Sequence, residues 1–198
     1  ENRKNIHLRG KDYYQKLLDT YPDNSYITLS SIDLKARLND LQAQLTKTLK
    51  EAEKFTEKTK PGKIENNQQE QKRLQEEIDF LQDKISQGAT IVPLSGTLVL
   101  EYGKTSENIY AGMDEEYRRY QPAIITWYET AKHAFERGAD WQNMGGIEND
   151  LNGGLYSFKS KFNPTIEEFA GEFNLPTNPL YYLSNLAYTI RKKLRSKH

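Results

Sequence analysis

The amino-acid sequence predicts a mixed α/β (α+β) protein in which a sheet with helices is interrupted by a long helical insertion. Two contrasts along the chain support this prediction. Residues 34–86 are polar and leucine-spaced and hold one of the twelve glycines, whereas the flanking segments hold the other eleven and nearly all the aromatic residues. The flanking segments also contain several strand-like runs, two of them joined by a turn signal.

The insertion has the spacing of a coiled coil, with seam positions at alternating steps of four and three residues in both halves. The seam residues are Leu34, Leu38, Leu41, Leu45, Thr48, Ala52 and Phe55, then Ile64, Asn67, Gln71, Leu74, Ile78, Leu81 and Ile85. We expect Lys60-Pro61-Gly62 to end the first helix and turn the chain. Two helices of roughly 35–40 Å would then lie antiparallel within one chain. A dimerising coiled coil is the alternative.

The segments on either side of the insertion are expected to form one domain. We predict helices at residues 11–21, 121–138 and 179–198, and strands at residues 25–33, 89–103, 107–113, 140–147 and 165–173. Lys104-Thr105-Ser106 is the predicted turn between the second and third strands. The apolar face of the helix 121–138 is predicted to consist of Ile124, Trp127, Tyr128, Ala131, Ala134 and Phe135.

The expected domain organisation is therefore an inserted antiparallel coiled-coil arm at residues 34–87 within a domain formed by residues 1–33 and 88–198. A strand pair followed by a long helix and another strand is the core order of acetyltransferase-like (GNAT) domains, which is an analogy of order alone.

Composition excludes several classes of site. The chain has no cysteine, so disulfides, thiolate metal sites and cysteine nucleophiles are excluded, and its 28 basic residues balance its 28 acidic ones. No apolar run approaches the ~18 residues of a membrane span. The three histidines are scattered without metal-ligand spacing, and we expect neither a metal nor a cofactor. The chain begins at Glu1 without methionine, which suggests a piece of a longer protein.

A family resemblance becomes specific from Val92 onward. The segments "SENIYAGM", "ERGADWQNMGGI", "GLYSFKSKFNPTIEEFAGEF" and "NPLYYLSNLAYTIRKKL" occur in that order. Together with the inserted arm they resemble the C-terminal half of the FemABX family, tRNA-dependent aminoacyltransferases that build peptidoglycan cross-bridges, with a texture similar to the MurM/MurN type.

The resemblance implies a reaction without a protein nucleophile. A side-chain lysine amine of a lipid-linked peptidoglycan precursor attacks the ester of an aminoacyl-tRNA, and serine, alanine or glycine is transferred. It also implies a cytoplasmic protein, and an active site between two domains, so that this half alone would be inactive. A non-catalytic RNA- or protein-binding module with a coiled-coil arm is the alternative function.

The pair Phe158-Lys159 follows the double glycine Gly153-Gly154, and we expect it to begin a strand, with the two side chains on opposite faces. The resemblance implies that Lys159 is catalytic, because a fixed cation stabilises the oxyanion of an ester under attack. Phe158 would stack on the terminal adenine of the tRNA. The alternative is that Phe158 belongs to the core and Lys159 is solvated.

Three further residues are candidates for binding the precursor. Arg9 and Tyr13 lie four apart at the start of a helix, on one face. The resemblance places this region at the diphosphate end of the precursor, which suits an arginine. Tyr110 would line the same cleft, although a core tyrosine is the alternative. The acidic run at residues 114–116 is interpreted as a solvated loop.

Two basic segments complete the prediction. The arm tip carries Lys54, Lys58, Lys60 and Lys63, which either contact tRNA phosphates or simply solubilise the tip. The C-terminal helix ends in Arg191, Lys192, Lys193, Arg195 and Lys197. These residues suit a helix C-terminus and would equally suit peripheral contact with the anionic cytoplasmic face of a membrane.

Overall fold

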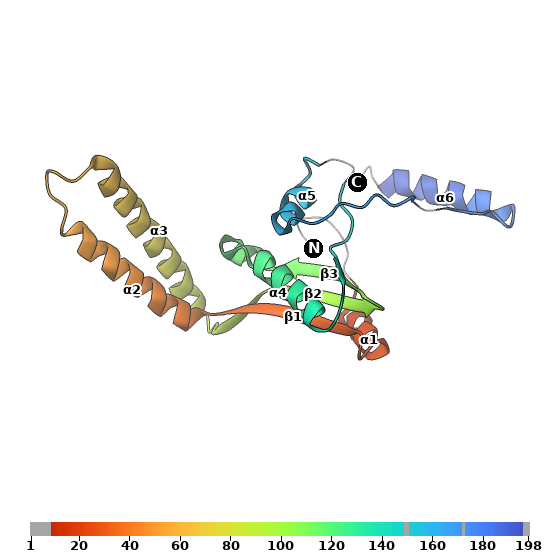
Figure 1. The fold of residues 1–198 in the computed structure, drawn as a ribbon, viewed down its shortest axis with the longest axis horizontal. Coiled ribbons are helices and arrows are strands. Elements are labelled where there is room, and N and C mark those ends of the chain that lie inside the picture. The colour runs from red at the N-terminus through yellow and green to blue at the C-terminus, as the bar shows by residue number, and fades with distance from the viewer. Residues whose placement is uncertain (1–8, 149–150, 172, 196–198) are drawn as a thin grey trace. The chain divides into compact units, whose positions relative to one another are not determined.

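The computed structural model describes residues 9–148, 151–171 and 173–195 and forms two compact units, residues 1–162 and 163–198. The first unit contains the sheet and the arm, and the second contains the C-terminal helix (Figure 1). The predicted division into a domain of residues 1–33 and 88–198 with an arm at 34–87 stays a prediction.

The sheet of the first unit has four strands in the order β1 (Ser25–Asp33), β2 (Ile91–Tyr102), β3 (Thr105–Met113) and β4 (Trp141–Asn143). The first three strands pair antiparallel and β4 pairs parallel to β3. Four of the five predicted strands are therefore confirmed, although β4 is shorter than expected. The predicted turn was displaced: Gly103 and Lys104 connect β2 to β3, and Thr105 and Ser106 already belong to β3.

Helix α1 (Lys11–Thr20) precedes β1, and helix α4 (Pro122–Glu136) packs against one face of the sheet through threonines. Thr126 Oγ1 lies 2.7 Å from Ser30 Oγ, and Thr130 Oγ1 lies 2.7 Å from Thr97 Oγ1. The predicted apolar face was therefore partly wrong, since Tyr128 is 55% exposed and Phe135 is 51% exposed. Each threonine hydroxyl also donates to a carbonyl four residues earlier, which satisfies a polar group that burial alone would disfavour.

The arm consists of α2 (Leu34–Ala52) and α3 (Pro61–Ser86), two helices that run antiparallel (Figure 1). Its core contains Leu34, Leu41, Leu74, Ile78 and Leu81, all predicted seam residues. Asn67, a polar seam residue, is 8% exposed and donates from Nδ2 to the carbonyl of Thr48 at 3.0 Å. This bond satisfies the buried amide and ties the two helices in one register.

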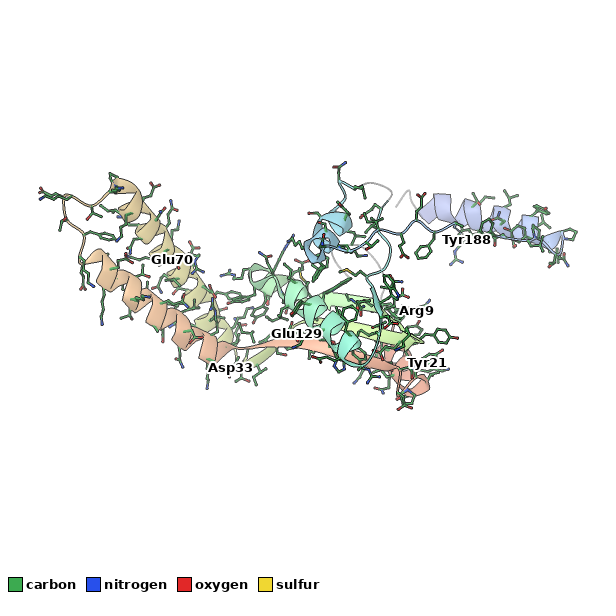
Figure 2. The ribbon with its side chains drawn as sticks, viewed as in Figure 1. Arg9, Tyr21, Asp33, Glu70, Glu129 and Tyr188 are labelled. Atoms are coloured by element: carbon green, nitrogen blue, oxygen red, sulfur yellow. The ribbon has the colours of Figure 1, made fainter. Side chains whose placement is uncertain are left out.

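The first arm helix begins as the sequence predicts but ends early, and the second begins at Pro61, within the segment predicted to be the turn. Asp33 is the N-cap of α2, and its carboxylate accepts from the backbone amides of Lys35 and Ala36 at 2.9 and 3.0 Å. Pro61 lies in the first turn of α3, as expected for a proline. However, α2 ends at Ala52, not at Lys60, so that residues 53–60 connect the helices. Figure 2 labels Asp33 where β1 passes into α2.

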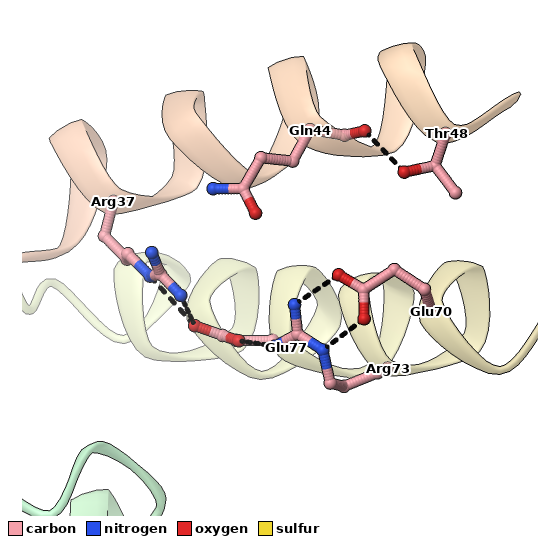
Figure 3. Close-up of polar contacts among 6 residues, drawn as sticks. All are labelled: Arg37, Gln44, Thr48, Glu70, Arg73 and Glu77. Atoms are coloured by element: carbon pink, nitrogen blue, oxygen red, sulfur yellow. Dashed lines mark hydrogen bonds and ion pairs between the residues drawn. The ribbon is translucent and has the colours of Figure 1, made fainter. Parts of the chain in front are cut away.

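A charged network joins the two arm helices (Figure 3). Glu77 is 5% exposed, and its carboxylate accepts from Arg37 Nε and Nη2 at 2.9 and 2.7 Å, and from Arg73 Nη1 at 3.2 Å. Arg73 also donates to both oxygens of Glu70, at 2.7 and 2.8 Å, and this bond lowers the pKa of the Glu70 carboxyl. The buried carboxylate is therefore paired from both helices, which burial of a charge requires.

The 3-10 helix η1 (Glu115–Tyr120) fixes the base of the arm to the sheet. Its buried Tyr117 belongs to the same core as Leu94 of β2, and its ring lies 5.4 Å from that of Phe80 in α3. Lys84 Nζ is 2.9 Å from Glu116 Oε2. Burial, followed by the neighbouring Glu77 carboxylate, raises the pKa of Tyr120 to about 12. Apolar and ionic contacts together thus hold the arm base against the strand that follows it.

The second unit differs from the prediction. Helix α6 (Leu180–Arg195) confirms a C-terminal helix, but the predicted strand at residues 165–173 was wrong, because the described residues of that range form neither strand nor helix. Among the described helices, none is long and apolar enough to cross a membrane.

Candidate active site

Lys159 is the last residue of the short helix α5 (Gly154–Lys159), so the predicted strand at this point was wrong. The residue is 7% exposed. Its Nζ donates to the carbonyl oxygens of Gly145 at 2.9 Å and Gly146 at 2.6 Å, and lies 6.0 Å from the centre of the Trp127 ring. The structure therefore contradicts the alternative that Lys159 is solvated.

The backbone of the Gly145-Gly146 turn is shaped for this contact. Gly145 has φ +74°, a left-handed conformation that glycine adopts readily and other residues rarely do. Its amide donates to the Asn143 side-chain oxygen at 2.8 Å, which ties the turn to the end of β4. The sheet thus positions the two carbonyls that hold the Lys159 ammonium.

Phe158 lies in an aromatic cluster beside Lys159. Its ring is 5.3 Å from the Trp127 ring and 5.6 Å from the Phe162 ring, both in edge-to-face geometry. Phe162 belongs to the 3-10 helix η2 (Ser160–Phe162), which directly follows α5. The helical backbone removes the expectation that Phe158 and Lys159 point to opposite faces of a strand, since consecutive helical residues are about 100° apart around the axis.

The structure brings Arg9, Tyr13 and Tyr110 together, as the sequence predicts for one cleft. The Tyr110 hydroxyl donates to the Tyr13 hydroxyl at 3.3 Å, and the Arg9 guanidinium lies 5.6 Å from the centre of the Tyr13 ring. Tyr14, which was not among the predicted binding residues, completes the cluster, with its ring centre 5.1 Å from that of Tyr110. The hydrogen bond with Tyr13 raises the pKa of Tyr110, so the Tyr110 hydroxyl keeps its proton at neutral pH.

A shallow hollow of about 210 Å³ lies beside this tyrosine cluster. Tyr14 and Tyr110 line it together with Ile27, Leu98 and the glycines Gly96 and Gly112. Tyr110 pairs with Leu98, whereas Thr97, the next residue, contacts α4. Because side chains alternate along a strand, the hollow is on the sheet face away from α4.

The arm lysines are exposed, and one of them is already paired. Lys54, Lys58 and Lys60 lie in the connection between the arm helices. Lys63 lies in the first turn of α3, 3.0 Å from the Glu51 carboxylate and 5.4 Å from the centre of the Phe55 ring. This pairing reduces the positive charge that Lys63 offers to a ligand.

The C-terminal basic residues are described only in part. Arg191, Lys192, Lys193 and Arg195 belong to α6, and Arg191 is exposed, while Lys197 lies outside the described residues. No group of three or more histidine or acidic side chains with the geometry of a metal site is found within residues 9–148, 151–171 and 173–195.

Comparison with known proteins decides the family. Residues 1–189 match the model of the FemAB family. The chain belongs to the FemAB family. Proteins named lipid II:glycine glycyltransferase match it from Staphylococcus epidermidis, at 28% identity over 190 residues, and from Staphylococcus saprophyticus, at 29% over 187 residues. A relative of the same name from Staphylococcus aureus is 25% identical over 197 residues.

The match covers 88% of this chain but 45–46% of each of these FemAB relatives, so the chain spans about half of their length. The crystal structure of FemX superposes with a TM-score of 0.51 and 21% identity, covering 81% of this chain and 43% of FemX. This likeness supports the fold, a mixed α/β architecture. The MurM/MurN subtype and the assignment to a C-terminal half stay predictions.

Sequence reasoning missed three residues that shape the surroundings of Lys159 in this FemAB chain. Trp127 was assigned to the apolar face of its helix, and Gly145 and Gly146 were assigned to the segment 140–147, a predicted short strand that runs into a glycine turn. The double glycine directly after a strand was the available signal, because it permits a backbone conformation that exposes carbonyls. Nothing in the sequence pairs that turn with a lysine 13 or 14 residues later.

Proposed function

We propose that this chain is part of an aminoacyltransferase that moves an amino acid from an aminoacyl-tRNA to the lysine amine of a peptidoglycan precursor, lipid II. The observation that carries this proposal is the buried Lys159 ammonium, held by two glycine carbonyls in a chain of the FemAB family. The names of the relatives favour glycine as the transferred amino acid, with serine and alanine as the other candidates.

In the proposed reaction the neutral lysine amine attacks the ester carbonyl of the aminoacyl-tRNA. The carbon–nitrogen bond forms, the carbon–oxygen bond to the ribose breaks, and the proton lost by the amine ends on the ribose hydroxyl. The carbonyl oxygen is negatively charged in the intermediate. Since an anionic oxygen accepts a stronger hydrogen bond than a neutral carbonyl, the Lys159 ammonium can exchange a glycine carbonyl for the oxyanion.

The burial of Lys159 supports this role in two ways. Lys159 as a residue is 7% exposed, and its interaction with a developing charge is stronger in such a buried position than in solvent. The two carbonyl contacts hold its position before the substrate arrives, so that stabilising the oxyanion requires the exchange of one hydrogen bond and no larger reorganisation. A non-catalytic module would require neither burial nor fixation of this lysine.

The other predicted residues have complementary proposed roles. Phe158 stacks on the terminal adenine, and the cluster of Arg9, Tyr13 and Tyr110 binds the diphosphate end of the precursor, with the guanidinium as its cation. The arm lysines, Lys54, Lys58, Lys60 and Lys63, contact tRNA phosphates. The basic end of α6 contacts the cytoplasmic membrane surface, where a lipid-linked precursor resides.

The proposed architecture is an acetyltransferase-like domain with an inserted coiled-coil arm. The acetyltransferase-like domain is supported by the parallel addition of β4 to an antiparallel sheet, with α4 between β3 and β4 in chain order. The coiled-coil arm is supported by the heptad core of α2 and α3.

The test is a transfer assay with the full-length protein, pools of charged tRNA and lipid II. We expect glycine to appear on the precursor only when glycyl-tRNA is supplied. Absence of transfer from every charged tRNA would contradict the proposed function. Transfer of serine or alanine alone would retain the reaction and correct the amino acid.

A further inference from the structure

A second hollow, on the α4 side of the sheet, has no role in the reaction described above. Its volume is about 410 Å³, and it is lined by Tyr120, Gln121, Ile124, Ile125, Tyr128, Lys161 and Phe162. These residues come from η1, the first half of α4 and η2, with Gln121 between η1 and α4. Glu129, which follows Tyr128 on α4, is labelled in Figure 2 and marks this part of the helix.

The hollow adjoins the site of Lys159 through Phe162. Phe162 lines the hollow, and its ring also lies 5.6 Å from the Phe158 ring and 6.4 Å from the Trp127 ring. Trp127 in turn contacts the Lys159 ammonium. A ligand in the hollow would therefore be separated from Lys159 by the rings of Phe162 and Trp127.

The chemistry of the lining fits a nucleotide. Tyr128 is 55% exposed and Ile125 is 50% exposed, so an aromatic ring and an apolar side chain are open to a flat base. Lys161 is exposed and makes no ion pair with any residue that the structure describes. Among the lining residues there is one cation and no carboxylate. Aromatic faces for stacking combined with a cation for the phosphate are what single-stranded nucleic acid recognition uses.

We propose that this hollow binds a nucleotide of the single-stranded 3′ end of tRNA, on the 5′ side of the terminal adenosine. The base stacks on Tyr128 and the phosphate lies at Lys161. This inference rests on the proposed function, because it takes the RNA end as the substrate that reaches Lys159. It adds a subsite for a nucleotide that does not react, and whose binding would place the ester beside the ammonium.

The test measures binding of an uncharged RNA minihelix ending in CCA to the full-length protein, over a salt series. We expect Tyr128→Ala to weaken binding between about fivefold and a hundredfold, the usual value of one base–aromatic stack, without changing the salt dependence. Tyr128→Phe keeps the ring and should bind like the wild type. Lys161→Gln should reduce the slope of log affinity against log salt by about 0.7, the value for one phosphate contact in a single strand.

Two matched variants control for general effects. Tyr102, 91% exposed at the end of β2, and Lys35, exposed on α2, do not line the hollow. Tyr102→Ala and Lys35→Gln should leave affinity and slope unchanged.

The outcomes separate the subsite from the proposed function. Wild-type affinity in both Tyr128→Ala and Lys161→Gln would overturn the subsite, while transfer activity of the wild type would leave the proposed function standing. Loss of thermal stability in Tyr128→Ala without loss of RNA affinity would show that protein covers the hollow, and would also overturn the subsite. Failure of the wild type to bind the minihelix would overturn both.

Discussion

Replacing Gly145 with alanine tests whether the turn after β4 positions Lys159. Gly145 has φ +74°, and a Cβ at this position would lie 3.7 Å from Lys159 Nζ, an ordinary contact distance. The cost is therefore backbone strain and not a clash, and for a non-glycine residue in this region it amounts to about 1–2 kcal/mol. Gly146 is a matched control, because its φ is not left-handed and a Cβ there would meet nothing within 4 Å.

Two consequences follow for Gly145→Ala in the full-length protein. If the turn keeps its shape, a strain of this size lowers Tm by roughly 2–8 °C. If the turn relaxes, the carbonyl moves away from the ammonium, and a displacement near 1 Å lowers turnover by up to about a hundredfold. Gly146→Ala should stay within about 2 °C and twofold in turnover.

Thermal unfolding and transfer assays on both variants distinguish these outcomes. The reasoning fails if the Gly145 and Gly146 variants have the same Tm and the same turnover as each other, because only one of the two positions requires a left-handed backbone.

Three further predictions concern other parts of the chain. The free energy of unfolding should fall as the pH rises from 10 toward 12, because the unfolded chain ionises Tyr120 near its ordinary pKa of 10.0 while the folded chain retains that proton up to about 12. Tyr120→Phe should flatten this fall. An equally steep fall in the variant would exclude Tyr120 as the group responsible. Replacing the four arm lysines with glutamine should weaken tRNA binding and flatten its salt dependence without lowering Tm; unchanged binding across the salt series would leave the arm without an RNA contact. The 198-residue chain alone should fold, as circular dichroism would show, but transfer no amino acid; transfer by this chain would show that the rest of the length of its relatives is dispensable.

The arm was the most predictable part of the fold. Its heptad spacing is a local pattern, and Leu34, Leu41, Leu74, Ile78 and Leu81 form the core that this pattern predicts. The end of α2 at Ala52 was missed, because a proline limits where a helix can continue but does not require the helix to reach it.

The face of α4 was less predictable, because the contact with the sheet is made by threonines. Thr126 and Thr130 are buried, and their hydroxyls form hydrogen bonds with those of Ser30 and Thr97, respectively. Apolar spacing predicts that the larger side chains are the buried ones, so the predicted buried face of α4 is rotated away from the face that the threonines form. Polar residues that are satisfied across an interface leave no such signal in the sequence.

The candidate site was predictable as a position but not as a geometry. Lys159 was identified through a family motif, and the same six-residue stretch, Gly154–Lys159, forms a helix where a strand was expected. A segment this short is decided by its tertiary contacts, not by intrinsic propensity. The Gly145 and Gly146 carbonyls were missed because carbonyl positions depend on backbone conformation, which the residue types permit but do not specify.

Turnover of Lys159→Met in the full-length protein tests the central claim most directly. Methionine has similar length but no charge, so it removes the proposed oxyanion donor, for which typical losses in turnover exceed tenfold. Thermal unfolding should first establish that the variant is folded, with Lys159→Arg as a charged comparison if it is not. The account predicts at least a tenfold loss of turnover with tRNA affinity changed by no more than a few-fold, whereas near-normal turnover in a folded Lys159→Met protein would contradict it.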